Sequence, residues 1–315
     1  MGDSLRTLGN TPEGEAVITR SVEHNPWFTR TDILRAIDAI CSEMLDRTKL
    51  REWLAHYPTT STARRVAVIM AGNIPMVGLF DLVCVIAAGH ECHIKPSSKD
   101  SVLMRYVVES LKAIDPNVAI YDYDPTEHYD MAIATGGDDA NRYFREHFAQ
   151  TRSLLRGSRH SIAVLDGTES TLELEGLTTD ITAYSGLGCR SVAMLFIPRG
   201  TMPLLPHTEP INPKLRGTLR STRALYTLQH RGFNDHGAYL SVYGEEFSKS
   251  LAMVTLREYD NLDEVRQWIS TNAGHLQCIV SHADISGAVP FGRGQYPTLW
   301  DYADGIDTMR FLLDN

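Results

Sequence analysis

The chain has 315 residues, 43% of them hydrophobic, so it can bury a large core and form about two domains. Its 39 acidic and 30 basic side chains give a formal net charge of −9, which argues against a broad nucleic-acid-binding surface. No apolar run approaches the roughly 18 residues of a membrane span, and the N-terminal segment has no signal-peptide core. We therefore expect a cytoplasmic protein with no nucleic-acid partner and no membrane span.

The five cysteines are an odd number scattered along the chain, which favours reduced thiols over a disulfide framework. His90, Cys92 and His93 are close in sequence but lack a second ligand pair at zinc-finger spacing. The aspartates between 301 and 307 recur every three residues, and nothing joins them at ligand spacing. We expect no metal site.

Along the chain, apolar strands alternate with helices. After a weakly structured segment at 1–20, the pattern predicts a helix from about 31, a strand at 65–70, a helix at 76–88, a strand at 93–96, a helix at 101–113, a strand at 130–135, a helix at 141–149 and a strand at 161–165. Strands at 191–198, 251–257 and 277–280 and a helix at 262–270 follow, whereas 200–237 shows no clear pattern. This alternation is typical of doubly wound α/β sheets.

Two glycine-containing loops carry chemical signals. Gly186 and Gly188 precede Cys189, so a substrate could approach the backbone closely and the cysteine could take an acyl group as a thioester. A buried apolar cysteine is the alternative, and Arg190 would favour the thiolate only if its charge lies near the sulfur. Gly136-Gly137 joins a strand to a helix, a junction that suits a phosphate-bearing ligand but lacks the full three-glycine fingerprint.

Six motifs in a fixed order give the chain a family resemblance. They are Met70-Ala71-Gly72-Asn73-Ile74-Pro75, Lys95-Pro96-Ser97-Ser98-Lys99-Asp100, Ala134-Thr135-Gly136-Gly137, Val164-Leu165-Asp166-Gly167, Gly186-Leu187-Gly188-Cys189-Arg190 and the C-terminal 299–308 segment beginning Leu299-Trp300-Asp301. With these motifs the chain resembles the acyl-CoA reductase family, which includes the fatty-acid reductase subunit of bacterial bioluminescence, within the aldehyde dehydrogenase superfamily.

The resemblance implies an aldehyde dehydrogenase-like α/β fold of two doubly wound domains, with the active site in the cleft between them. We expect a cofactor-binding domain with an N-terminal helical cap at 1–167 and a catalytic cysteine domain at 168–284. Residues 285–315 would form a C-terminal return segment packing near the active site. Members of the superfamily commonly pair, so a homodimer is possible.

The resemblance also assigns catalytic roles. Cys189 would be the nucleophile, in agreement with its glycine-flanked loop. Asn73 would donate its side-chain amide to the oxyanion of the acyl adduct, a role that suits a group that stays neutral at every working pH. The alternative for Asn73 is a loop asparagine that satisfies its own backbone.

Cofactor residues follow in the same way. Lys95 matches the superfamily lysine at the adenosine ribose, and Gly136 and Gly137 match the loop at the pyrophosphate. Ser98 stands where many NAD-preferring relatives have a glutamate, so a 2′-phosphate would not be repelled, and NADPH is favoured while NADH stays possible. A solvated surface lysine is the alternative for Lys95.

The implied reaction is the NADPH-dependent reduction of an acyl-CoA to a fatty aldehyde, with release of CoA and a covalent thioester on Cys189. Val164 aligns with the glutamate that activates water in hydrolytic relatives, so the thioester would escape hydrolysis. Two alternatives remain. One is an aldehyde dehydrogenase that forms the acid with Asp166 as base, and the other is an acyl-binding or acyltransferase subunit without hydride transfer.

Overall fold

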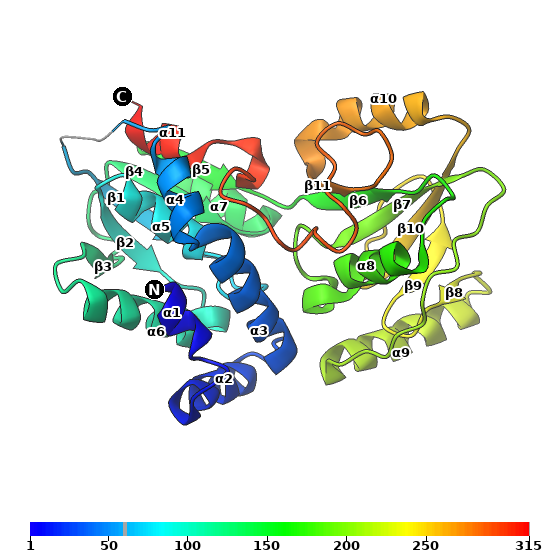
Figure 1. The fold of residues 1–315 in the computed structure, drawn as a ribbon, viewed down its shortest axis with the longest axis horizontal. Coiled ribbons are helices and arrows are strands. Elements are labelled where there is room, and N and C mark those ends of the chain that lie inside the picture. Colours follow the sequence, from blue (N-terminus) through cyan, green and yellow to red (C-terminus); the bar gives the residue numbers. More distant parts are fainter. Residues whose placement is uncertain (59–61, 315) are drawn as a thin grey trace. The chain divides into compact units, whose positions relative to one another are not determined.

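The computed structural model describes residues 1–58 and 62–314, which fall into two compact units (Figure 1). Unit 1 comprises Met1–Ser158 and Pro297–Asn315, and unit 2 comprises Arg159–Tyr296. The first boundary thus lies at 158, not at the predicted 167, because strand β6 pairs within the sheet of unit 2. The predicted return segment at 285–315 is divided between the units, since only its last part belongs to unit 1.

Unit 1 is built on a five-stranded parallel sheet with the strand order β3-β2-β1-β4-β5. Its elements are α1 (Gly2–Arg6), α2 (Pro12–His24), α3 (Arg30–Ala39), η1 (Ile40–Met44), α4 (Arg47–Leu54), β1 (Arg65–Ile69), α5 (Leu79–Ala87), β2 (Glu91–Lys95), η2 (Ser98–Asp100), α6 (Ser101–Ile114), β3 (Ile120–Asp122), β4 (Met131–Thr135), α7 (Asp138–His147), β5 (Arg152–Arg156), η5 (Ala303–Gly305) and α11 (Thr308–Leu313).

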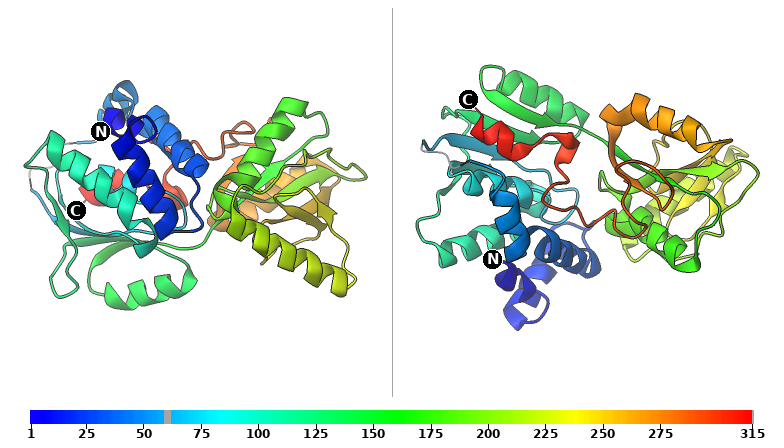
Figure 2. Two further views of the ribbon diagram at one scale, coloured as in Figure 1. Left: turned by 90° about the horizontal axis from the view of Figure 1, so that it is seen from below. Right: turned by 45° about the horizontal axis from the view of Figure 1, so that its top comes forward.

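The central strand of unit 1 is β1, in which Val66, Ala67 and Val68 are fully buried, as expected for a strand covered on both faces. The chain moves from β1 to β2 and β3 on one side and then to β4 and β5 on the other. Right-handed crossovers therefore place α7 on the opposite face of the sheet from α6, as the left view of Figure 2 shows. The strand order reverses between β1 and β4, and ligands of such sheets bind outside the carboxyl ends of the strands at this point.

The prediction of a weakly structured N-terminal segment is wrong. Thr11 caps α2 by accepting a hydrogen bond from Gly14 N–H, and Pro12 occupies the first turn of the helix. Leu5 and Leu8 are fully buried. The Thr-Pro pair was the sequence signal for this helix start.

Unit 2 contains a six-stranded sheet with the order β11-β6-β7-β10-β9-β8, in which only β8 is antiparallel to its neighbour. Its elements are β6 (His160–Val164), α8 (Thr171–Thr182), η3 (Ala183–Gly186), β7 (Val192–Pro198), α9 (Pro213–Leu228), β8 (Asn234–Asp235), β9 (Leu240–Tyr243), β10 (Met253–Tyr259), α10 (Leu262–Asn272), η4 (Ala273–His275) and β11 (Leu276–Val280). The region that showed no clear sequence pattern contains α9, whose start is marked by the cap Asn212 and by Pro213.

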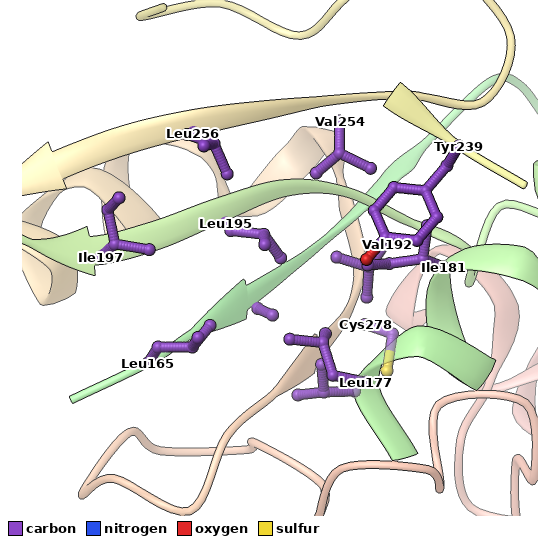
Figure 3. Close-up of a cluster of buried hydrophobic side chains, with 12 residues drawn as sticks. Leu165, Leu177, Ile181, Val192, Leu195, Ile197, Tyr239, Val254, Leu256 and Cys278 are labelled. Carbon is purple, nitrogen blue, oxygen red and sulfur yellow. The ribbon is translucent and has the colours of Figure 1, made fainter. Parts of the chain in front are cut away.

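Side chains alternate across this second sheet. Ala163 and Leu165 belong to the buried cluster under α8, together with Leu177 and Ile181 of that helix (Figure 3). Ile162 and Val164 belong to a second cluster, which includes Val265 of α10. The period of two is that of a strand buried on both faces. Both doubly wound sheets predicted from the sequence are therefore present.

In the described ranges 1–58 and 62–314, no helix combines the length and the apolar character needed to cross a membrane.

Candidate active site

Cys189 lies in unit 2, in the loop between η3 and β7, and is the exposed member of the five cysteines. Its carbonyl accepts a hydrogen bond of 2.8 Å from Ser161 Oγ. Ser161 is paired in register with Val192, the first residue of β7, so the loop sits at the amino-terminal edge of the sheet. A buried apolar cysteine, the alternative left by the sequence, is therefore not what the structure has at this position.

The chain just before Cys189 is strained. Tyr184, Ser185 and Gly186 follow one another with φ values of 54°, 58° and 73°. Only glycine adopts this left-handed region without steric cost, and a non-glycine residue there costs on the order of 1–2 kcal/mol. Such strain persists only where the surroundings hold it, and here Tyr184 and Ser185 are both buried. This strained turn directly precedes the loop that carries Cys189.

Arg190 fixes the other side of this loop. Its Nε donates to the carbonyl of Gly294 at 2.5 Å, and its Nη2 lies 3.3 Å from Cys278 Sγ. These contacts show that the guanidinium ties the loop to the 290–296 segment and to β11. Activation of the Cys189 thiolate by Arg190 stays a prediction.

Asn73 lies in unit 1, exposed in the turn between β1 and α5. The shape of this turn is set by contacts with the segment after β2. Met76, with φ 55°, donates its N–H to Asp100 Oδ2 at 2.7 Å. A Cβ on Gly72 would lie 2.5 Å from the Ser97 side chain, so only glycine permits this close approach. The Asn73 loop is thus held against the loop predicted to bind the cofactor.

Asp100 was not singled out by sequence reasoning. Its side chain is buried, Oδ2 accepts the Met76 N–H, and Oδ1 has no hydrogen-bond partner among the described residues. Burial raises the pKa of this carboxyl to about 8, an effect only partly offset by the Met76 hydrogen bond. There was little indication of this role in the sequence, because a polar residue just before a helix is usually interpreted as its N-cap.

The structure brings the predicted cofactor residues to the same edge of the sheet as Asn73. Lys95 ends β2 and is exposed, as is Ser98, whose carbonyl accepts a 2.5 Å hydrogen bond from His24 Nε2. Gly136 and Gly137 follow β4. Since β2, β1 and β4 are neighbours, their carboxyl ends meet at the switch point of the sheet.

The residues at this edge fit a dinucleotide in most respects. Gly137 is the N-cap of α7; within residues 1–58 and 62–314, no side chain caps the start of this helix, and a Cβ at Gly137 would meet nothing within 4 Å. The N–H groups at the start of α7 are therefore open to a phosphate. Lys95 offers a cation at the end of β2, which is separated from β4 by β1. Asp138 and Asp139 in the first turn of α7 oppose this, because their charge repels an anion.

The alignment of Val164 with a catalytic glutamate position does not fit the structure. Val164 is fully buried in the cluster under α10, so a carboxylate there could not reach a thioester. At about 3.3 Å per residue it also lies roughly 10 Å along β6 from Ser161, the residue that contacts the Cys189 backbone. Asp166 lies beyond it, at the carboxyl end of the strand, opposite to the Cys189 edge. This geometry disfavours Asp166 as a base acting on Cys189.

Asp166 instead belongs to an ionic cluster that sequence reasoning missed. His282 Nε2 lies 3.0 Å from Asp166 Oδ1, and His282 Nδ1 lies 2.6 Å from Glu173 Oε1, with Glu169 near the same ring. The Glu173 carboxylate, and then Asp166, raise the pKa of His282 to about 9. Ligand-type atoms of Asp166, Glu169 and His282 lie within 4.8 Å of one another, but an imidazolium between carboxylates accounts for this spacing.

Solved structures define the class of fold. An oxidoreductase from Marinobacter aquaeolei matches 94% of this chain with a TM-score of 0.63 and 13% identity, over 77% of its own length. A propionaldehyde dehydrogenase from Clostridium phytofermentans matches 89% of this chain with a TM-score of 0.60 and 11% identity, over 76% of its length. The chain therefore has an aldehyde dehydrogenase-like fold.

Sequence comparison defines the family. Residues 10–207, more than half of the chain, match the model of the acyl-CoA reductase (LuxC) family, and the chain belongs to it. A long-chain acyl-protein thioester reductase of Photorhabdus laumondii is 25% identical over 180 residues, 50% of this chain and 38% of that protein. The enzyme of the same name from Photobacterium phosphoreum is 24% identical over 217 residues, 62% of this chain and 43% of its own length. The chain thus spans only about two fifths of the length of these relatives.

Proposed function

We propose that the protein reduces an acyl thioester to an aldehyde through a covalent intermediate on Cys189. The observation that supports this most is the exposure of Cys189 on a loop that follows two strained residues, Tyr184 and Ser185, while the other four cysteines are buried. Membership of the acyl-CoA reductase family agrees with this chemistry.

Each of the predicted site residues has its own role in the proposed reaction. The Cys189 thiolate attacks the carbonyl carbon of the thioester, the tetrahedral adduct collapses, and the thiol of the carrier leaves. Asn73 donates its side-chain amide to the oxygen of that adduct, which carries the developing negative charge. A reduced nicotinamide cofactor held by Lys95, Ser98, Gly136 and Gly137, NADPH in preference to NADH, would supply the hydride. Cys189 is released as a thiolate when the aldehyde leaves.

The carrier of the acyl group is CoA or the thiol of a protein. The family model is named for acyl-CoA, whereas the relatives are named long-chain acyl-protein thioester reductases. Both carriers present the same thioester carbonyl to Cys189. Our proposal is therefore a long-chain acyl thioester as substrate, and the experiment below separates the two carriers.

A second candidate is an acyl-transferring subunit that forms the Cys189 thioester without hydride transfer. Asp138 and Asp139 favour it, because they place negative charge at the helix start where a cofactor phosphate would bind. The acid-forming alternative has lost support with the position of Asp166 at the opposite edge of the sheet.

The test supplies the purified protein with a series of acyl-CoA thioesters and with an acylated carrier protein, each with NADPH or NADH. We expect cofactor oxidation and an aldehyde product identified by mass spectrometry. Cys189→Ala should abolish both aldehyde formation and thiol release, whereas Cys41→Ala removes a buried thiol in unit 1 and should retain activity. Normal turnover by the Cys189 variant contradicts the mechanism, and thiol release without aldehyde under every condition supports the second candidate.

A further inference from the structure

We propose that Gly294, Asp180 and Arg190 form a clasp that positions the Cys189 loop. The inference rests on the proposed role of Cys189 as nucleophile. None of the three residues is assigned contact with substrate or cofactor, so each would act through the loop as a positioning residue.

The clasp consists of three hydrogen bonds around the 292–294 turn. Asp180, in the last turns of α8 and fully buried, accepts the N–H of Gly294 on Oδ1 at 2.9 Å and the N–H of Gly292 on Oδ2 at 2.6 Å. Gly294 in turn accepts Arg190 Nε on its carbonyl. A carboxylate that accepts two N–H groups, and an arginine on a carbonyl, are charge-assisted hydrogen bonds, which are stronger than neutral ones.

Gly294 therefore holds both ends of one stretch of chain. Its N–H binds Asp180 and its carbonyl binds Arg190, and the residues between these two include the strained Tyr184–Gly186 turn and Cys189 itself. The 180–190 segment is closed into a ring by a single residue from a distant part of the chain. Closing the ring limits the ways in which the left-handed turn could relax, which is the condition for such strain to persist.

Glycine is needed at 294 because of close approach. A Cβ there would lie 2.9 Å from Asp180 Oδ1 and 3.3 Å from Val280 Cγ1, so either the carboxylate or the turn would have to move. A similar closeness exists at Gly176 of α8, where a Cβ would lie 3.0 Å from Gly292 N. The helix and the 292–294 turn thus approach each other at two glycines, which lets the buried carboxylate reach both N–H groups.

The consequence for catalysis is that the position of the Cys189 sulfur depends on the clasp. A displacement of about 1 Å in a reacting group lowers the rate of a positioned reaction by up to about 100-fold. Loss of the clasp should therefore lower kcat, while KM for the thioester changes little because these residues do not bind it.

The experiment compares Gly294→Ala, Asp180→Asn and Arg190→Gln with the unchanged chain. Gly274→Ala is the matched control, since a Cβ at this glycine of the same unit meets nothing within 4 Å. We measure amide hydrogen exchange of residues 184–191, kcat and KM for the acyl thioester, and thermal melting. The three clasp variants should exchange faster in 184–191 and lose about 10- to 100-fold in kcat with KM within about two-fold.

Arg190→Lys provides the conservative comparison. It retains a cationic donor for the Gly294 carbonyl but loses the contact with Cys278 Sγ, so its kcat should lie between those of the original chain and of Arg190→Gln. Because this change affects one partly buried side chain, it keeps the inference testable if Asp180→Asn or Gly294→Ala fails to fold.

Three results would overturn the clasp: unchanged exchange in 184–191, faster exchange with unchanged kcat, or equal effects from Gly274→Ala. If the original chain shows no thioester turnover at all, the proposed function fails, and the exchange data alone decide whether the clasp holds the loop.

Discussion

The loops that carry Asn73 and Cys189 are each held by a buried aspartate, but the two carboxylates are satisfied to different degrees. Asp180 uses both oxygens on backbone N–H groups of the 292–294 turn. Asp100 accepts the Met76 N–H with one oxygen, and its other oxygen has no hydrogen-bond partner in the part of the chain that the structure describes. Because an unpartnered charge is costly inside a protein, the pKa of Asp100 is raised to about 8. The aspartate that holds the Cys189 loop therefore has both oxygens paired, whereas the protonation state of the aspartate that holds the Asn73 loop depends on pH.

Removal of Asn73 itself should have the largest effect. Asn73→Ala deletes the proposed donor to the oxyanion, and loss of one such donor lowers kcat by about 100- to 1000-fold. Steady-state kinetics with the preferred thioester measure this. Asn117→Ala, at an exposed asparagine after α6, is the control and should leave kcat unchanged. A decrease of less than about ten-fold would show that the Asp100-held loop serves the fold and not the reaction.

Asp180→Ala should have the next largest effect. The change leaves the N–H groups of Gly292 and Gly294 without their acceptor, and each unsatisfied buried N–H costs about 1–3 kcal/mol. We therefore expect the free energy of unfolding to fall by about 2–6 kcal/mol, measured by urea denaturation. Asp100→Ala leaves one N–H unpaired instead of two, so its cost should be smaller. Equal losses for the two variants would contradict the comparison.

Much of the fold could be predicted from the sequence, and the failures have physical reasons. The 65–70 strand was recognisable because β1 is apolar on both faces. Strand β5 was missed because it begins and ends with arginine, and only the fold shows that Arg156 is buried against Asp81 and Thr308. That ion pair joins positions far apart in the sequence, so no local pattern indicates it.

The exposed Cys189 loop could be predicted from the sequence, but the residues that hold it could not. A cysteine between glycines and an arginine is visible in one line of sequence, and its exposure followed. Asp100 and Asp180 look like ordinary acidic residues near helix ends, because their partners are backbone N–H groups 24 and 112–114 residues away. The Val164 assignment does not fit because Val164 is buried and lies far along β6 from Ser161, and a sequence motif fixes neither its burial nor this distance.

Asp100→Asn tests the pH dependence of the anchor of the Asn73 loop. The folded-state pKa of Asp100 is about 8, above the usual 3.8, so its contribution to stability is present below pH 3.8 and is lost as the pH rises through 8. Asparagine keeps an acceptor for Met76 N–H and has no charge. We expect the variant to melt at least about 2–4 °C higher than the original chain at pH 9, and at a similar temperature at pH 4. A lower Tm for the variant at pH 9 would show that the ionised carboxylate stabilises the loop.

His282→Gln should have the smallest effect, because its cluster lies at the carboxyl edge of β6, opposite to the edge of the sheet that carries Cys189. The pKa of His282 is raised to about 9 from 6.5, so its contribution to stability is complete below pH 6.5 and disappears as the pH rises through 9. The pKa of Glu173 is lowered to about 2 from 4.5 by hydrogen bonds from Ser170 and His282, so its contribution is lost as the pH falls from 4.5 through 2. The pair therefore stabilises unit 2 most between pH 4.5 and 6.5.

Melting curves should show that the His282→Gln variant loses stability at pH 6 and little at pH 9.5, with kcat at pH 6 unchanged. A fall in kcat at pH 6 without loss of stability would mean that the His282 cluster, at the opposite edge of the sheet, also positions Cys189. The cluster would then not serve stability alone, and Asp180 would not differ from it in kind.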